Sequence, residues 1–183
     1  MEPQFVDTVQ YDPIAAANQI MSDYNFIGVT ERMDESAVAL QLLLGLTTGD
    51  ILFLNSKGSG GFDDGATPRG CVYIVPSYVS PGMKEYFASR EWERIALADT
   101  MLHRAANRSL DLTIEKLGRQ RFNRALTKFR DAMKVVRERC LPTVQFPCTS
   151  SGEPIAQPNC FWGDSGCGTA CLDELANELN FYS

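Results

Sequence analysis

Cysteine is concentrated at one end of this chain. Five of the six cysteines lie within residues 140–183, a stretch that is also rich in Pro, Gly and Ser. An even number of cysteines among turn-forming residues is typical of a small segment that disulfides hold together. We therefore expect all six to be oxidised, with a pairing that the sequence leaves open. The six are Cys71, Cys140, Cys148, Cys160, Cys167 and Cys171.

Zinc coordination and free thiols are the alternatives to disulfides. A zinc site usually contains two close Cys pairs or a His beside one pair. Here Cys167 and Cys171 form one close pair, and the only histidine, His103, is distant in the sequence. The spacing thus favours disulfides over metal, and we expect this pair to cluster with Cys148 and Cys160 in the tail.

Length and composition fit a globular domain with a short appendage. The chain has 183 residues, of which 44% are hydrophobic and 22% charged, so global disorder is excluded. No apolar window reaches the ~18 residues of a membrane span, and the acidic start lacks the pattern of a signal peptide. We expect one domain over residues 1–140 and a cysteine-rich tail over 141–183.

Charge is also distributed unevenly. Residues 116–139 contain nine basic and two acidic side chains, whereas residues 141–183 contain five acids and no Lys or Arg. The formal net charge of −6 argues against a general nucleic-acid binder, which is normally basic. The basic stretch is more typical of a solvated helix face than of an anion site. Because their charges are opposite, the basic stretch and the acidic tail are also expected to contact each other.

Hydrophobic periodicity predicts a helix-dominated α/β fold. An apolar run at 25–29 indicates a buried strand. Residues 55–70 are polar and glycine-rich, which indicates a loop. The predicted helices are 14–23, 35–46, 84–117 with a break near 108–111, 119–138 and a short one at 172–179.

Three groups of polar residues are candidates for chemistry. Lys57 with Ser56 and Ser59 could present an ammonium and backbone N–H groups to a phosphate, although a solvated loop is the simpler reading. His103 is a candidate base, but an ordinary surface pair with Asp99 at i, i+4 is more typical. A third group is acidic and more often serves a helix N-terminus through its dipole. Its members are Glu31, Asp34 and Glu35.

Two stretches resemble the C-terminal half of Golgi carbohydrate sulfotransferases. Residues 25–36 contain Gly28-Val29-Thr30-Glu31 before an apolar helix, similar to an element of heparan sulfate and uronyl 2-O-sulfotransferases. The pattern from Trp92 through Asp99 to Asn107 and Asp111 resembles a late helix of that family. The tail from Cys160 to Cys171 is similar to cysteine-rich ends of algal sulfotransferase-like proteins. The resemblance covers about residues 14–135.

The resemblance implies a P-loop-like α/β fold and sulfuryl transfer from 3′-phosphoadenosine 5′-phosphosulfate (PAPS) to a carbohydrate hydroxyl. It also implies a basic loop that closes over the nucleotide, at the place of residues 55–69, with Lys57 and Arg69 as its cations beside Ser56 and Ser59. The family's phosphosulfate loop, the groups for the 3′-phosphate and the catalytic base have no counterpart here. The chain therefore looks like a C-terminal fragment or a degenerate paralogue, inactive alone, with no catalytic or metal-binding residue assigned.

Two functions follow as expectations. The first is membership of the carbohydrate sulfotransferase family, in the Golgi lumen or secretory pathway, with a glycan acceptor. The second is a secreted, disulfide-stabilised binding or structural module without catalysis. Neither expectation includes nucleic acid or a membrane span as a partner.

Overall fold

A computed structural model describes residues 12–54, 71–156, 160 and 168–179 of the chain. These residues form seven α-helices and three short 3₁₀ segments, and they contain no strand. The expected helix dominance is confirmed, whereas the expected sheet is not found within the described ranges. The helices are α1 (Pro13–Asp23), α2 (Met33–Leu44), α3 (Pro81–Phe87), α4 (Arg90–Ile95), α5 (Leu97–Leu117), α6 (Arg119–Arg139) and α7 (Thr169–Glu178).

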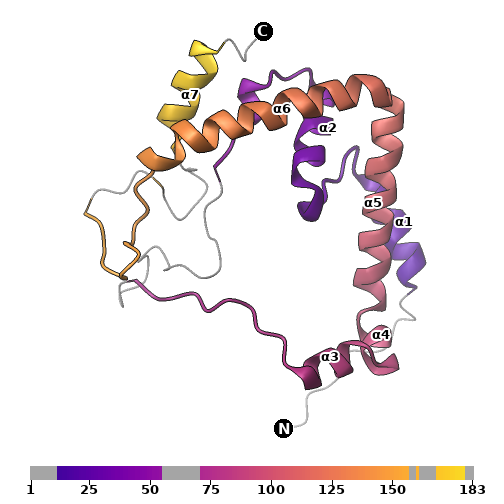
Figure 1. Ribbon diagram of the computed structural model, residues 1–183. Coiled ribbons are helices and arrows are strands. Elements are labelled where there is room, and N and C mark those ends of the chain that lie inside the picture. The colour runs from indigo at the N-terminus through magenta and orange to yellow at the C-terminus, as the bar shows by residue number, and fades with distance from the viewer. Residues whose placement is uncertain (1–11, 55–70, 157–159, 161–167, 180–183) are drawn as a thin grey trace.

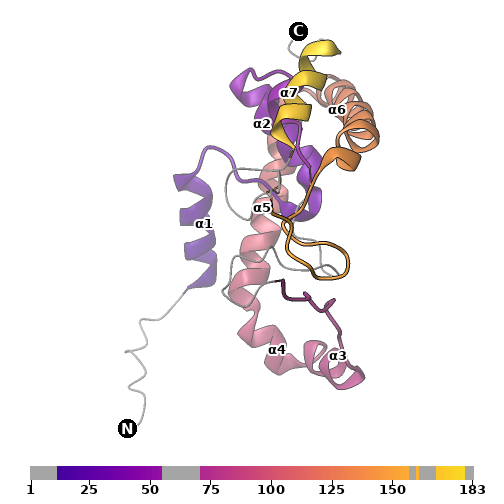
Figure 2. The same cartoon turned by 90° about the vertical axis from the view of Figure 1, so that its left-hand side faces the viewer.

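Helices α5 and α6 form the frame of the molecule. They meet in a corner at Gly118, whose φ of +85° is a conformation that favours glycine. Helix α2 packs inside this corner against both helices, and α1 lies along α5 (Figures 1 and 2). The main core fills the corner. Its most deeply buried side chains come from all three helices and are Val38, Leu110, Phe122 and Phe129.

The predicted strand at 25–29 is wrong. Residues 26–29 run without a β-partner into the 3₁₀ segment η1 (Thr30–Arg32). Val29 is buried in the core, and its carbonyl accepts the Arg32 N–H of η1 at 3.0 Å. The Ser36 hydroxyl accepts the Val29 N–H at 2.8 Å and donates to the Val29 carbonyl at 3.1 Å. This apolar run therefore needs no neighbouring strand to bury its backbone.

The predicted helix at 84–117 is three helices, α3, α4 and α5. The breaks lie at residues 88–89 and at Ala96 rather than near 108–111. Ser89 starts α4 by accepting the Trp92 N–H at 3.2 Å, as an N-cap serine does. Ser80 starts α3 in the same way, with Pro81 at its first position.

The tail is fastened to the helical frame. Cys140 at the end of α6 forms a disulfide with Cys171 in α7. Beside it, the Arg139 guanidinium donates two hydrogen bonds to the Glu178 carboxylate, at 2.7 and 3.0 Å. The expected contact between the basic helix and the acidic tail is thus present. Leu172 and Leu175 of α7 complete a second small core with Val136.

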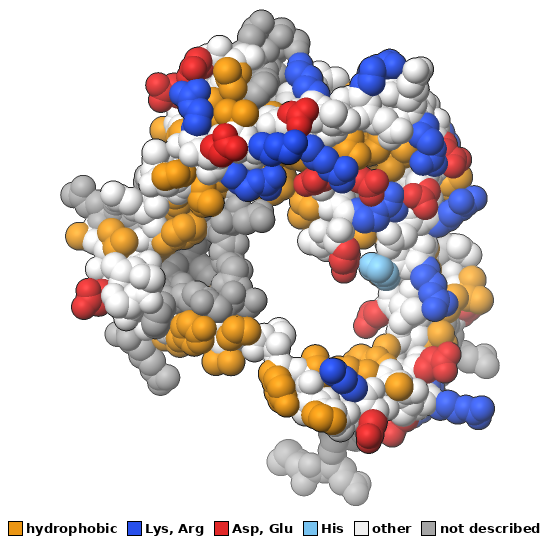
Figure 3. Space-filling view, in the orientation of Figure 1, with side chains coloured by type: hydrophobic (Ala, Val, Ile, Leu, Met, Phe, Trp, Pro, Cys, Tyr) orange, Lys and Arg blue, Asp and Glu red, His pale blue; other side chains and the backbone are white. Residues whose placement is uncertain are grey.

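A second disulfide closes the molecule into a ring. Cys71 is bonded to Cys148, and the two residues are 77 positions apart in the sequence. From Cys71 an extended segment leads to α3, on the far side from α6 (Figure 1). The space-filling view shows an opening between this segment and the helical frame (Figure 3). None of the described helices is long and apolar enough to cross a bilayer.

Oxidation of the cysteines is confirmed for the five that are described. Cys160 is disulfide-bonded as well, and none of the five is a free thiol. The expected tail cluster is corrected by the pairing, because Cys148 and Cys171 reach outside the tail to Cys71 and Cys140. Cys167 lies outside the described residues.

Candidate functional site

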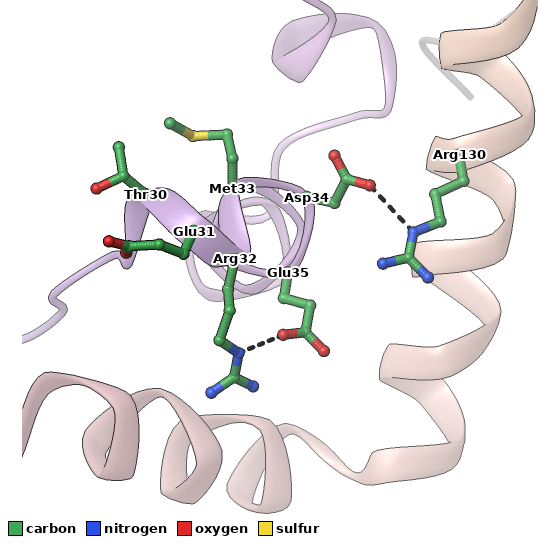
Figure 4. A pocket seen from close by; sticks show the side chains of 7 residues that line it. All are labelled: Thr30, Glu31, Arg32, Met33, Asp34, Glu35 and Arg130. Atoms are coloured by element: carbon green, nitrogen blue, oxygen red, sulfur yellow. Dashed lines mark hydrogen bonds and ion pairs between the residues drawn. The ribbon is translucent and has the colours of Figure 1, made fainter. Parts of the chain in front are cut away.

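The start of α2 carries a cluster of charged side chains. Residues 26–29 approach it in extended conformation, and η1 then turns the chain so that successive polar side chains point outward (Figure 4). A Cβ at Gly28 would lie 3.3 Å from the Ser36 Cβ, which is tighter than ordinary contact. The small Gly28 therefore permits the close approach that lets Ser36 hold Val29. An open hollow of about 370 Å³ lies beside it, lined by residues 30–35 and Arg130.

Arg32 is the centre of this surface. Its side chain is only 25% exposed and forms an ion pair with Glu35 one turn along α2. It also reaches α5, where it pairs with Asp111 at 2.9 Å and donates to the Asn107 Oδ1 at 3.4 Å. Hydrogen bonding to Glu35 raises the pKa of Arg32 above its ordinary value, so the guanidinium stays charged. One cation thus joins η1 and α2 to α5.

His103 belongs to the edge of the same network. Its Nε2 lies 3.5 Å from the Glu31 carboxylate and 3.3 Å from the Asn107 amide. The predicted pair with Asp99 is corrected, because the ion pair is made across helices rather than along α5. The pKa of Glu31 is lowered mainly by a hydrogen bond that its carboxylate accepts from its own backbone N–H. A hydrogen bond from His103 lowers it further.

The acidic side chains at the start of α2 each face a basic group. Glu31 faces His103, Glu35 faces Arg32, and Asp34 lies 3.1 Å from the Arg130 Nε of α6. Figure 4 shows that Glu31, Asp34 and Glu35 point away from the helix end in different directions. These ion pairs therefore connect the start of α2 to both α5 and α6. The acidic groups do not converge on one point, as metal ligands do. No metal-binding group of His, Cys, Asp or Glu occurs among the described residues.

The phosphate-contact residues predicted from sequence lie outside the described residues. These are Ser56, Lys57, Ser59 and Arg69. The structure does place the two stretches that resemble sulfotransferases. Their polar residues meet at Arg32, which was not among the predicted site residues. The i, i+4 spacing of Asn107 and Asp111 on one helix face was the signal that pointed to a shared partner.

Chemically, this arrangement fits a structural junction better than a reaction centre. Each guanidinium and carboxylate named above already has an opposite charge as its neighbour. Both members of the His103–Glu31 pair are more than half exposed, so they lack the dry surroundings that strengthen catalytic electrostatics. Comparison of the chain with protein-family models, curated proteins and solved structures gave no significant match.

Proposed function

We propose that this chain forms the helical part of a carbohydrate sulfotransferase-type protein. The observation that supports this proposal is the contact between the two stretches that carry the resemblance. Arg32 of the first donates to Asn107 of the second across 75 positions of sequence. A contact between the two stretches is what a shared structural unit would contain.

In the proposed reaction, an acceptor hydroxyl oxygen attacks the sulfur of PAPS. The bond from sulfur to the bridging phosphate oxygen breaks, 3′-phosphoadenosine 5′-phosphate leaves, and a base takes the hydroxyl proton. The leaving phosphate and the proton both need groups that this sequence does not provide in recognisable form. The chain would therefore act together with a region that carries the phosphosulfate loop, in an oxidising compartment such as the Golgi lumen.

Transfer of labelled sulfate from PAPS to a panel of desulfated polysaccharides tests this proposal. The assay compares the polypeptide encoded by the complete natural transcript with the 183-residue chain alone. We expect transfer by the former, and neither transfer nor micromolar PAPS binding by the latter. If the complete polypeptide transfers no label to any acceptor, the proposal is wrong.

Substitution of Lys57 tests the proposal at a single residue. A charge-assisted contact to phosphate contributes ~1.5–3 kcal/mol, or roughly 10- to 150-fold in affinity. In the complete polypeptide, Lys57→Ala should weaken PAPS binding by about that factor and leave thermal stability unchanged. Lys84, exposed on α3, provides the matched control. If Lys57→Ala binds PAPS with the same affinity as the parent, Lys57 does not contact the nucleotide.

A secreted module without catalysis is the second candidate, and the disulfides favour it. Cys71–Cys148 and Cys140–Cys171 are bonds that persist in oxidising compartments. The transcript upstream of Met1 separates the two candidates. A strand, a Pro-Lys-x-x-Ser/Thr turn and a helix there, with a membrane anchor, support the sulfotransferase. A signal peptide immediately before Met1 supports the module.

A further inference from the structure

Residues 72–79, here called the arm, are extended and carry no charge. The arm runs from the disulfide-bonded Cys71 to Ser80, the N-cap of α3 (Figure 1). Its sequence is Val-Tyr-Ile-Val-Pro-Ser-Tyr-Val, in which β-branched and aromatic residues dominate. Such residues favour strands. The arm therefore has the composition of a strand. Tyr73 lies in an isolated β-bridge, whereas residues 74–79 belong to no strand or bridge.

The arm and the two short helices after it expose apolar side chains. Ten of the 20 exposed large hydrophobic residues among the described ones lie within 72–97. Val75 is 75% and Tyr78 is 76% exposed, and no residue of the arm is buried. The aromatic rings of Tyr86, Phe87 and Trp92 pack on one another at the end of the arm. Large exposed apolar patches are rare on monomeric proteins and often mark interaction sites.

The backbone of the arm is also unpaired over most of its length. Residues 74–79 make no backbone hydrogen bond within the described part of the chain. An extended segment with free N–H and C=O groups is a template for pairing with another strand. Because successive residues of a strand direct these groups to opposite edges, Pro76 spoils only one edge. The other edge, formed by Val75, Ser77 and Val79, keeps every donor and acceptor.

We propose that the arms of two copies of this chain pair as antiparallel strands through the edge of Val75, Ser77 and Val79. A two-fold axis brings the same edge of both copies together, as in most homodimers. The arm has no charge to repel its twin. Pro76 then lies on the outer edge of each strand, where proline is tolerated. This inference is independent of the proposed sulfotransferase function.

Paired proline variants test the proposal on the full, oxidised chain. Val75→Pro removes an N–H from the pairing edge, whereas Ile74→Pro removes one from the outer edge and is the matched control. Sedimentation equilibrium should show a dimer for the parent. We expect Val75→Pro to weaken that dimer by about tenfold or more, and Ile74→Pro to change it little.

Amide hydrogen exchange on the unmodified chain gives a second readout. The amides of Val75, Ser77 and Val79 should be protected in the dimer, while those of Ile74 and Tyr78 exchange fast. Apolar association without strand pairing would not produce this alternation. A parent that remains monomeric at its highest soluble concentration overturns the proposal. So does a dimer that both proline variants weaken equally, or an arm that is protected in the monomer.

Discussion

Arg32 joins segments that are far apart in the sequence because a guanidinium can donate to several acceptors at once. Its partners on α5 are Asn107 and Asp111, and its partner on α2 is Glu35. The side chain is only 25% exposed, so solvent screens these contacts less than it screens an ordinary surface pair. Arg32 therefore couples the start of α2 directly to α5.

Arg32→Ala should lower the free energy of unfolding by ~1–3 kcal/mol, because it leaves two carboxylates without their cation. Arg32→Lys should recover only part of this loss, since an ammonium cannot reproduce the fork. Urea denaturation under non-reducing conditions measures both changes. Arg119→Ala is the control, because it removes an exposed pair with Glu115 and should cost less than ~0.5 kcal/mol. Equal losses at the two positions would contradict a special role for Arg32.

Glu178 should titrate below its ordinary pKa, because the hydrogen bonds from Arg139 stabilise its charged form. A carboxyl whose pKa is lowered by folding adds stability above the ordinary value of 4.5, and this contribution is lost as pH falls through the folded value. NMR titration of the side-chain carboxyl checks this. Arg139→Gln should return the Glu178 pKa to its ordinary range while leaving the lowered pKa of Glu31 unchanged. An unmoved Glu178 titration would show that the pair does not form in solution.

The extended residues 26–29 depend on a helix side chain instead of a neighbouring strand. Ser36→Ala removes both of its hydrogen bonds to Val29 and leaves the buried Val29 N–H without a partner, whereas the Val29 carbonyl keeps its hydrogen bond from the Arg32 N–H. We expect the free energy of unfolding to fall by ~1–3 kcal/mol, measured by thermal or urea denaturation. Ser22→Ala is the control, because the Ser22 hydroxyl bonds an exposed carbonyl of its own helix. A Ser36→Ala variant as stable as the parent would mean that the packing of Val29 and its hydrogen bond from Arg32 are enough to hold the segment.

Local patterns predicted the helices well and their connections poorly. Helices α1, α2 and α6 follow from alanine content, apolar periodicity and caps, which act within a few residues. The prediction of a strand at 25–29 was wrong because the sequence of an apolar run does not show what its backbone bonds to. A neighbouring strand and the Ser36 side chain are both compatible with it. The break before α4 depends on the Ser89 cap within a helix-favouring stretch, whereas α5 begins after Ala96 without a side-chain cap. The ion pairs of Arg32 and Arg130 join distant segments, and no local pattern encodes their partners.

The arrangement of the whole chain combines a packed corner with a thinly supported arc. Helices α2, α5 and α6 share the main core, whereas α3 and α4 contain no buried residue. The arc that leads from Cys71 through the arm to α5 is fastened at one end by a disulfide and at the other by chain connection. Its position therefore rests on a covalent bond more than on packing.

Opening the Cys71–Cys148 bond should expand the molecule without unfolding its helices. In the Cys71→Ser, Cys148→Ser double variant, the loop of 77 positions is no longer closed, and few buried contacts remain to hold the arc. Small-angle scattering extrapolated to zero concentration should show a larger radius of gyration, with the helical circular dichroism preserved. The Cys140→Ser, Cys171→Ser variant is the contrast, because it releases α7 from a core that packing also supports. An unchanged radius in the first variant would show that contacts other than the disulfide hold the arc against the rest of the chain.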